Sequence, residues 1–151
     1  MIKIICVGKI KEKYFKDAID EYLKRLTRYT KINIIEVEDV DVSNVNINLE
    51  KERDSILKYI NEKDYVITLE IEGKILDSPA LSKKIDNILM NNPNITFIIG
   101  GSYGLHGDIK KRSDYQLSFS KLTFPHQLFR IILLEQIYRS FKILKNESYH
   151  K

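Results

Sequence analysis

Hydrophobic and polar residues follow two alternating patterns along the chain. Short apolar runs predict five strands, at residues 2–8, 31–37, 64–71, 95–101 and 115–120. Apolar residues at helical spacing predict five helices, one of them short, at residues 13–29, 49–60, 78–90, 108–112 and about 125–145. Residues 38–48 are acidic and Asn-rich and are expected to form a loop. Gly73 is expected to mark the turn after the third strand.

Strands that alternate with helices predict an α/β fold, a single domain over residues 1–151 with a largely parallel sheet and helices on both faces. A ligand of such a sheet binds at the carboxyl ends of the strands. Three segments fall there: the end of the third strand, the glycines after the fourth, and residues 118–124 after the fifth. We therefore expect a binding site built from these segments.

The last predicted helix is apolar around nearly its whole circumference. Its apolar residues are Leu128, Phe129, Ile131, Ile132, Leu133, Leu134, Ile137, Tyr138 and Phe141. A helix that is apolar on all sides must be covered on all sides, and in a small domain a second copy of the chain supplies the missing surface most simply. A symmetric homodimer is therefore expected.

Charge is spread unevenly along the chain. The net charge is +4; residues 1–101 carry 16 Lys and Arg against 17 Asp and Glu, whereas residues 102–151 carry 9 against 4. A basic C-terminal third favours an anionic partner, with nucleic acid first, although many basic faces are only solvated. No apolar run reaches the length of a membrane span, and no signal peptide is recognisable, so a cytoplasmic location is expected.

The side chains that could act as nucleophiles or metal ligands exclude several classes of function. The lone Cys6 lies in an apolar run and is interpreted as a core residue rather than a nucleophile. The three histidines, His106, His126 and His150, are scattered without cysteines or paired carboxylates at ligand spacing, so no metal site is expected. The Gly100–Gly104 turn matches neither phosphate-binding glycine motif, because it follows the fourth strand and its spacing differs.

Two further segments have a functional and a structural interpretation. Residues 118–124 offer hydroxyl and backbone groups for an adenine edge, or form only a capped helix start. The basic and aromatic tail carries Arg139, Tyr149 and His150, which can contact phosphates and bases, or it is a solvated terminus. The glycine turn likewise lets a flat ligand approach the backbone, or is a plain turn.

In their order along the chain, five segments resemble a known family. They are VGKIKEKYFKDAIDEYLKR, VITLEIEGK, FIIGGSYGL, LSFSKLTFPHQLFRIILLEQIYRSFKI and the terminal YHK. The set is similar to the small bacterial SPOUT-class methyltransferases, in particular to those that methylate N3 of a pseudouridine in a stem-loop of 23S (large-subunit) ribosomal RNA. The resemblance covers essentially the whole chain and implies a C-terminal trefoil knot, an obligate homodimer and S-adenosylmethionine as methyl donor.

The resemblance also implies site residues. Leu69 would pack against the adenosine, and Gly100 and Gly101 would let the backbone approach the cofactor. The segment that would wrap the adenine with backbone hydrogen bonds comprises Phe119, Ser120, Lys121, Leu122, Thr123 and Phe124. His150, Tyr149 or a water would assist loss of the N3 proton, with Arg139 stabilising charge on the uracil oxygens.

Methyl transfer would then be a direct displacement that depends on placing the ring nitrogen in line with the methyl group. Without a separate RNA-binding domain, the dimer is expected to prefer assembled ribosomal particles to free RNA. The alternative is a non-catalytic RNA- or ribosome-binding factor with the same fold. A flavodoxin-like binding module is disfavoured, because no phosphate loop follows the first strand.

Overall fold

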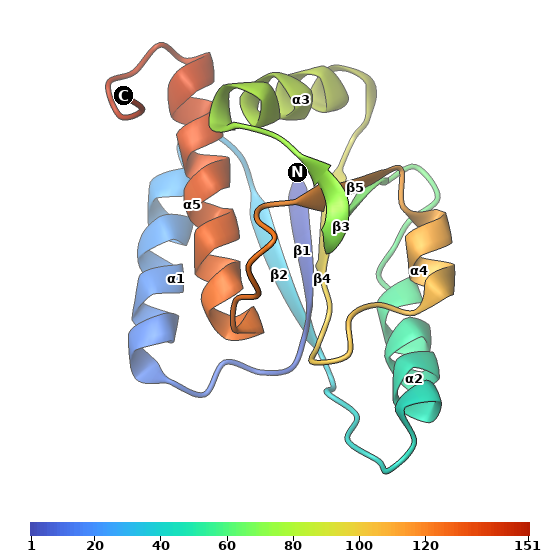
Figure 1. Cartoon of the computed structure of the whole chain (residues 1–151). Coiled ribbons are helices and arrows are strands. Elements are labelled where there is room, and N and C mark those ends of the chain that lie inside the picture. Colours follow the sequence, from blue (N-terminus) through green and yellow to red (C-terminus); the bar gives the residue numbers. More distant parts are fainter.

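The computed structural model describes residues 1–151 and contains one five-stranded sheet in the order β2-β1-β4-β3-β5, in which every pair is parallel (Figure 1). The strands are β1 (Ile2–Val7), β2 (Ile32–Val37), β3 (Tyr65–Ile75), β4 (Ile95–Ile99) and β5 (Tyr115–Ser118). The helices are α1 (Lys13–Leu26), α2 (Val45–Leu57), α3 (Ser78–Asn91), α4 (Gly107–Arg112) and α5 (His126–Leu144). The α/β fold and the parallel sheet are confirmed.

Helices cover both faces of the sheet. The larger core joins one face to α1, α3 and α5, and the smaller core joins the other face to α2 and α4. In Figure 1 the blue α1 and the red α5 accordingly run side by side, away from α2 and α4. Strands β1 and β4 are buried along their full length, because both of their faces are covered.

The acidic loop is shorter than the sequence pattern predicts. Helix α2 begins at Val45, and the side chain of Asn44 caps it by accepting hydrogen bonds from the backbone N–H groups of Asn46 and Ile47. Asn48, already within the helix, exchanges two hydrogen bonds with the backbone of Val42 and closes the loop. The expectation of a loop over residues 38–48 is therefore wrong from residue 45 onward. The side chain of Asn44 caps the helix, and that of Asn48 holds the preceding loop through hydrogen bonds.

Strand β3 does not turn at Gly73. It continues to Ile75, and Leu117 of β5 pairs first with Leu69 and then again with Lys74, so residues 70–73 form a bulge. A Cβ atom on Gly73 would lie 2.8 Å from three backbone atoms of β5. The backbones of β3 and β5 thus approach each other at Gly73 too closely for a side chain, and the predicted turn is wrong.

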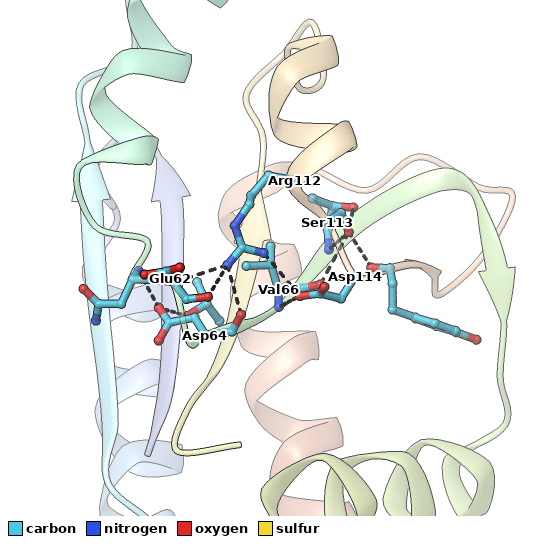
Figure 2. Close-up of polar contacts among 10 residues, drawn as sticks. Glu62, Asp64, Val66, Arg112, Ser113 and Asp114 are labelled. Carbon is cyan, nitrogen blue, oxygen red and sulfur yellow. Dashed lines mark hydrogen bonds and ion pairs between the residues drawn. The ribbon is translucent and has the colours of Figure 1, made fainter. Parts of the chain in front are cut away.

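Side chains near the start of β3 fix the position of α4 and β5. Arg112 donates to the carbonyl oxygens of Asn61, Glu62 and Asp64, and to the carboxylate of Asp114 (Figure 2). Asp114 in turn accepts from the backbone N–H of Val66 at 2.8 Å. These contacts hold the end of α4 and the first turn into β5 against the amino end of β3.

The beginning of α5 is tied to the sheet by a buried arginine. The side chain of Arg130 is 1% exposed; it pairs with Glu36 at 2.7 Å and donates to the carbonyl oxygens of Val7 and Gly8. Because such a charge is costly to bury without partners, these three acceptors specify where α5 crosses the carboxyl ends of β1 and β2. Nothing in the pattern of an apolar helix indicates this role.

Helix α5 is not covered on all sides within one chain. Leu133, Leu134, Ile137, Tyr138 and Phe141 are buried, whereas Leu128, Phe129, Ile131 and Ile132 remain partly exposed. An uncovered apolar stripe of this kind is consistent with a second copy packing here, as the sequence pattern predicts. The homodimer and the trefoil knot stay predictions.

Candidate active site

A cavity of about 410 Å³ lies beside the bulge of β3 and at the carboxyl ends of β4 and β5. These are the three neighbouring strands whose ends the sequence analysis singled out, so the expected meeting of the three segments is confirmed. The cavity contains eight of the nine residues expected to hold the cofactor, namely Leu69, Gly100, Gly101, Phe119, Ser120, Leu122, Thr123 and Phe124. The ninth, Lys121, is exposed and is not part of the lining.

The glycines of the turn Gly100–Gly104 have different structural roles. A Cβ on Gly100 would lie 2.7 Å from the carbonyl oxygen of Gly104, so Gly100 allows the turn to close on itself. A Cβ on Gly101 would lie 3.1 Å from Val7 and 3.3 Å from Glu52, on the side of the smaller core. Gly104 has φ +79° with open space around it, and this conformation favours glycine. The turn is therefore compact, with its backbone forming one wall of the cavity.

The segment Phe119–Phe124 makes no backbone–backbone hydrogen bond. Only two of its backbone groups have side-chain partners: the N–H of Leu122 donates to the hydroxyl of Ser120, and the carbonyl of Ser120 accepts from Ser118. The remaining N–H and C=O groups are free to pair with a ligand or with solvent. Since polar backbone groups seek partners, this segment can recognise the edge of a flat heterocycle.

The lining of the cavity also carries charged and exposed apolar groups. Glu70 accepts a hydrogen bond from Thr68 at 2.7 Å and faces Lys110 at 3.4 Å, with its own side chain only 8% exposed. Ile71 and Leu122 also line the cavity, yet they are 47% and 71% exposed. Large apolar side chains left in solvent at a cavity mouth are typical of a surface that a ligand or partner covers.

Arg139, Tyr149 and His150, the three residues expected to act in the reaction, lie together beside the carboxylate of Glu135. Glu135 Oε1 accepts from Arg139 Nη2 at 2.6 Å, from Arg139 Nε at 3.0 Å and from the Tyr149 hydroxyl at 3.1 Å. Arg139 lies over the Tyr149 ring, 4.8 Å from its centroid, and its Nη1 is 3.1 Å from His150 Nδ1. The tail is therefore folded onto α5 in this structure, rather than being a solvated terminus.

The electrostatics of this cluster limit what each group can do. Burial first, and the hydrogen bond to Glu135 second, raise the pKa of Tyr149 to about 12, so its hydroxyl stays protonated. The hydrogen bond to Glu135 also raises the pKa of Arg139 above its ordinary value. Because a guanidinium only donates, His150 Nδ1 accepts from it and the imidazole carries its proton on Nε2. Tyr149 and His150 are thus hydrogen-bond donors in this arrangement.

Within one chain, the tail and the 410 Å³ cavity lie on opposite sides of a shared wall. His150 lines a second cavity of about 590 Å³, and Leu117, Phe119 and Phe124 contribute to both cavities. The structure therefore does not bring the two predicted groups of site residues into one cavity of a single chain.

Burial raises the pKa values of two further side chains, Cys6 and Glu52. Burial raises the pKa of the Cys6 thiol to about 12, which removes it as a nucleophile and confirms the core interpretation. Burial first, and repulsion from Asp39 second, raise the pKa of Glu52 to about 7. Glu52 lies against Gly101 and has no hydrogen-bond partner in the chain, so its charge is not compensated.

Replacing Glu52 by glutamine is expected to stabilise the protein at about pH 8 by about 1–2 kcal/mol, allowing for partial solvation. The folded pKa of Glu52 lies above its ordinary value of 4.5, so the wild type loses stability as the pH rises from about 4.5 to about 7. The variant lacks this loss, and near pH 4 the two proteins should be nearly equal. Urea unfolding at both pH values measures the difference; an equal difference at the two would contradict it.

Comparison with known proteins identifies the family of this chain. A family model described as "Predicted SPOUT methyltransferase" matches residues 1–150, and the chain belongs to this family. Its curated relatives include proteins named ribosomal RNA large subunit methyltransferase H. The one from Clostridium kluyveri is 55% identical and that from Alkaliphilus oremlandii 53%, each with 99% of both chains covered; that from Caldicellulosiruptor saccharolyticus is 52% identical with full coverage.

A solved structure supports the fold at a greater distance. It is described as a probable methylase family protein from Haemophilus influenzae Rd KW20, and its TM-score to this chain is 0.58 at 11% identity. The match covers 99% of this chain and 70% of the other. No helix of this chain combines the length and apolarity that crossing a membrane requires.

Several residues of the site escaped the sequence analysis. Glu135 was missed, although its spacing of four from Arg139 is a signal for an ion pair on a helix. Glu70 and Lys110 come from separate elements, and no sequence pattern joins them. The same is true of Glu52 and the glycine turn.

Proposed function

We propose that this protein methylates N3 of a pseudouridine in a stem-loop of large-subunit ribosomal RNA, with S-adenosylmethionine as methyl donor. The observation that carries the proposal is the 410 Å³ cavity, which contains eight of the nine residues that the family resemblance assigns to the cofactor. The curated relatives, which are named for large-subunit ribosomal RNA, support the substrate class. The reaction would take place in the cytoplasm.

The residues of the cavity fit this cofactor. Its volume lies within the roughly 300–1,000 Å³ typical of small-ligand sites. Leu69, Leu117 and Phe129 offer apolar surface for a purine, and the unpaired backbone of Phe119–Phe124 offers hydrogen bonds to its edge. Glu72 places negative charge near a ligand that carries positive groups, whereas Glu70 is paired with Lys110 of the same lining. When bound, S-adenosylmethionine supplies an electrophilic methyl group, so no protein nucleophile is required.

The roles of the tail follow from its hydrogen bonds. Arg139, held in place by Glu135, would face the uracil oxygens and stabilise the negative charge that develops as N3 loses its proton. His150 would donate from Nε2 to the same ring. Because Tyr149 keeps its proton and His150 Nδ1 is occupied, the N3 proton would pass to water. Tyr149 would act as a positioning residue for Arg139.

The tail must then reach a cofactor that lies beyond the Leu117–Phe119–Phe124 wall. We place the two together across a homodimer, in which the tail of one chain completes the cofactor cavity of its partner. The partly exposed stripe of α5 supplies the contact surface. Light scattering should report a dimer, and a stable monomer would contradict this part of the proposal.

Assembled large ribosomal subunits are expected to be methylated at least about 10-fold faster than isolated RNA fragments. A small protein makes few contacts to a short stem-loop, and a large structured target adds phosphate contacts and shape. The measurement is the initial rate of transfer of a labelled methyl group to each substrate at equal concentration. Equal rates on fragments and intact particles would show that the preference is wrong.

Calorimetric titration with S-adenosylmethionine separates the enzyme from the alternative, a non-catalytic ribosome-binding factor. We expect one cofactor molecule to bind per chain, in each cavity that the tail of a partner chain completes. Lack of binding in both the absence and the presence of large ribosomal subunits would remove the methyltransferase and leave the binding factor.

A further inference from the structure

A third cavity, of about 520 Å³, lies apart from the 410 Å³ cavity and borders the 590 Å³ cavity at Leu76. Tyr65 and Tyr115, the first residues of β3 and β5, contribute to it. The rest of its lining comes mainly from α3 and the residues that flank it: Leu76, Ala80, Lys83, Lys84, Asn87, Ile88, Asn91 and Asn92. It shares no residue with the 410 Å³ cavity.

Two lysines converge on the ring of Tyr115, which lines this cavity together with Lys84; Lys74 is outside the lining and reaches the same ring from β3. The ammonium of Lys84 lies 3.7 Å from the centroid of the Tyr115 ring, and that of Lys74 lies 5.6 Å from the same centroid. The ring attracts both cations, and it comes from a different element than either lysine. The arrangement is therefore a feature of the tertiary structure rather than of one helix face.

Neither lysine has a carboxylate partner. Lys110 and Lys142 each form an ion pair with a glutamate, but Lys74 and Lys84 take part in no ion pair or hydrogen bond, and the cavity contains no acidic residue. Burial first, and repulsion from Lys74 second, lower the pKa of Lys84 below its ordinary value. The two positive charges, on half-buried Lys84 and exposed Lys74, thus oppose each other, and an anion between them would relieve that repulsion.

We propose that this cavity binds a phosphodiester group of the RNA, with Lys74 and Lys84 on the phosphate and Tyr115 beneath them. Asn87 and Asn91 add amide groups at the rim, which suit phosphate and sugar oxygens. The proposal rests on the proposed function only for the identity of the polyanion. The site contributes to docking and not to the reaction, because it shares no residue with the 410 Å³ cavity.

The test compares two double variants with the same change in net charge. Lys74→Gln with Lys84→Gln removes the pair, and Lys51→Gln with Lys58→Gln removes two exposed lysines without ion pairs at α2, on the other face of the sheet. Binding of large ribosomal subunits is measured over a range of salt concentrations without methyl donor. A third variant, Lys74→Arg with Lys84→Arg, keeps both charges and should restore binding.

Loss of the pair is expected to weaken binding about 10-fold or more and to lower the salt slope by about one, because one phosphate contact is lost, whereas the α2 variant should stay within about twofold of wild type. Equal weakening in both glutamine variants would overturn the site, as would no weakening in either. Because the binding assay contains no methyl donor, its result is read independently of whether methyl transfer is found.

A chemical readout tests the same cavity in the wild-type protein. Lys84 should react readily with an amine-acylating reagent near neutral pH, and large ribosomal subunits should protect it while exposed Lys51 stays reactive. Mass mapping of the labelled peptides measures both. Inorganic phosphate at the same total phosphate concentration should protect poorly; equal protection would overturn the assignment to RNA.

Discussion

Removal of the last three residues, Tyr149 to Lys151, is expected to lower the rate of methyl transfer by more than about 100-fold while S-adenosylmethionine binds with nearly unchanged affinity. The deletion removes His150 and the aromatic ring on which Arg139 rests, so the guanidinium loses its neighbours on one side. None of the three residues lines the 410 Å³ cavity. Single-turnover rates and calorimetric cofactor affinity measure the two quantities separately.

Two single substitutions keep this prediction interpretable. Glu135→Gln should also lower the rate, because it weakens the hold on Arg139 and Tyr149 while leaving the tail in place. Lys145→Ala changes an exposed residue of the same segment and should leave the rate unchanged. Normal turnover in the truncated protein would remove the tail from the mechanism, and loss of cofactor binding would show that its role is structural.

The second large effect is expected from Gly73→Ala, which should destabilise the folded state by about 3 kcal/mol. The new methyl group would lie 2.8 Å from backbone atoms of Gln116 and Leu117, and a β-strand backbone cannot move aside as a flexible side chain can. Relief requires β3 and β5 to separate, which would open the cavity between them. Urea unfolding measures the stability, and calorimetry should show a matching loss of cofactor affinity.

The matched control is Gly107→Ala, the same chemical change at the first residue of α4. A Cβ there meets nothing within 4 Å, so the substitution should be neutral or stabilise by up to about 1 kcal/mol. If both alanine variants unfold at the same urea concentration as wild type, the close approach of β3 and β5 at Gly73 does not limit stability.

The alternation of apolar and polar residues was sufficient to predict the parallel α/β fold and the strand ends that meet at the cavity. It failed where a single side chain sets a local boundary: Asn44 starts α2 earlier than the apolar spacing suggests, and Gly73 allows β3 to pass the point where a turn was expected. Both effects depend on backbone contacts that a periodic pattern does not contain.

The candidate site was likewise predicted in part. Residues close together in sequence, such as Phe119–Phe124, were placed together by the resemblance, and all of these except Lys121 line one cavity. Partners that meet only through folding were missed, including Glu135 with Tyr149 and Lys74 with Tyr115. No local signal pairs residues from separate elements, and such pairs supply most of the electrostatics of the site.

The most direct test of the proposed function is mass mapping of ribosomal RNA after reaction in vitro. Large ribosomal subunits from a strain that lacks this protein would be incubated with the purified protein and S-adenosylmethionine, and the RNA would then be digested and mapped. The proposed function predicts one added methyl group, on N3 of a single pseudouridine in a stem-loop. Methylation at another nucleotide or atom would contradict the substrate assignment, and no methylation of subunits that the protein binds would contradict the enzyme itself.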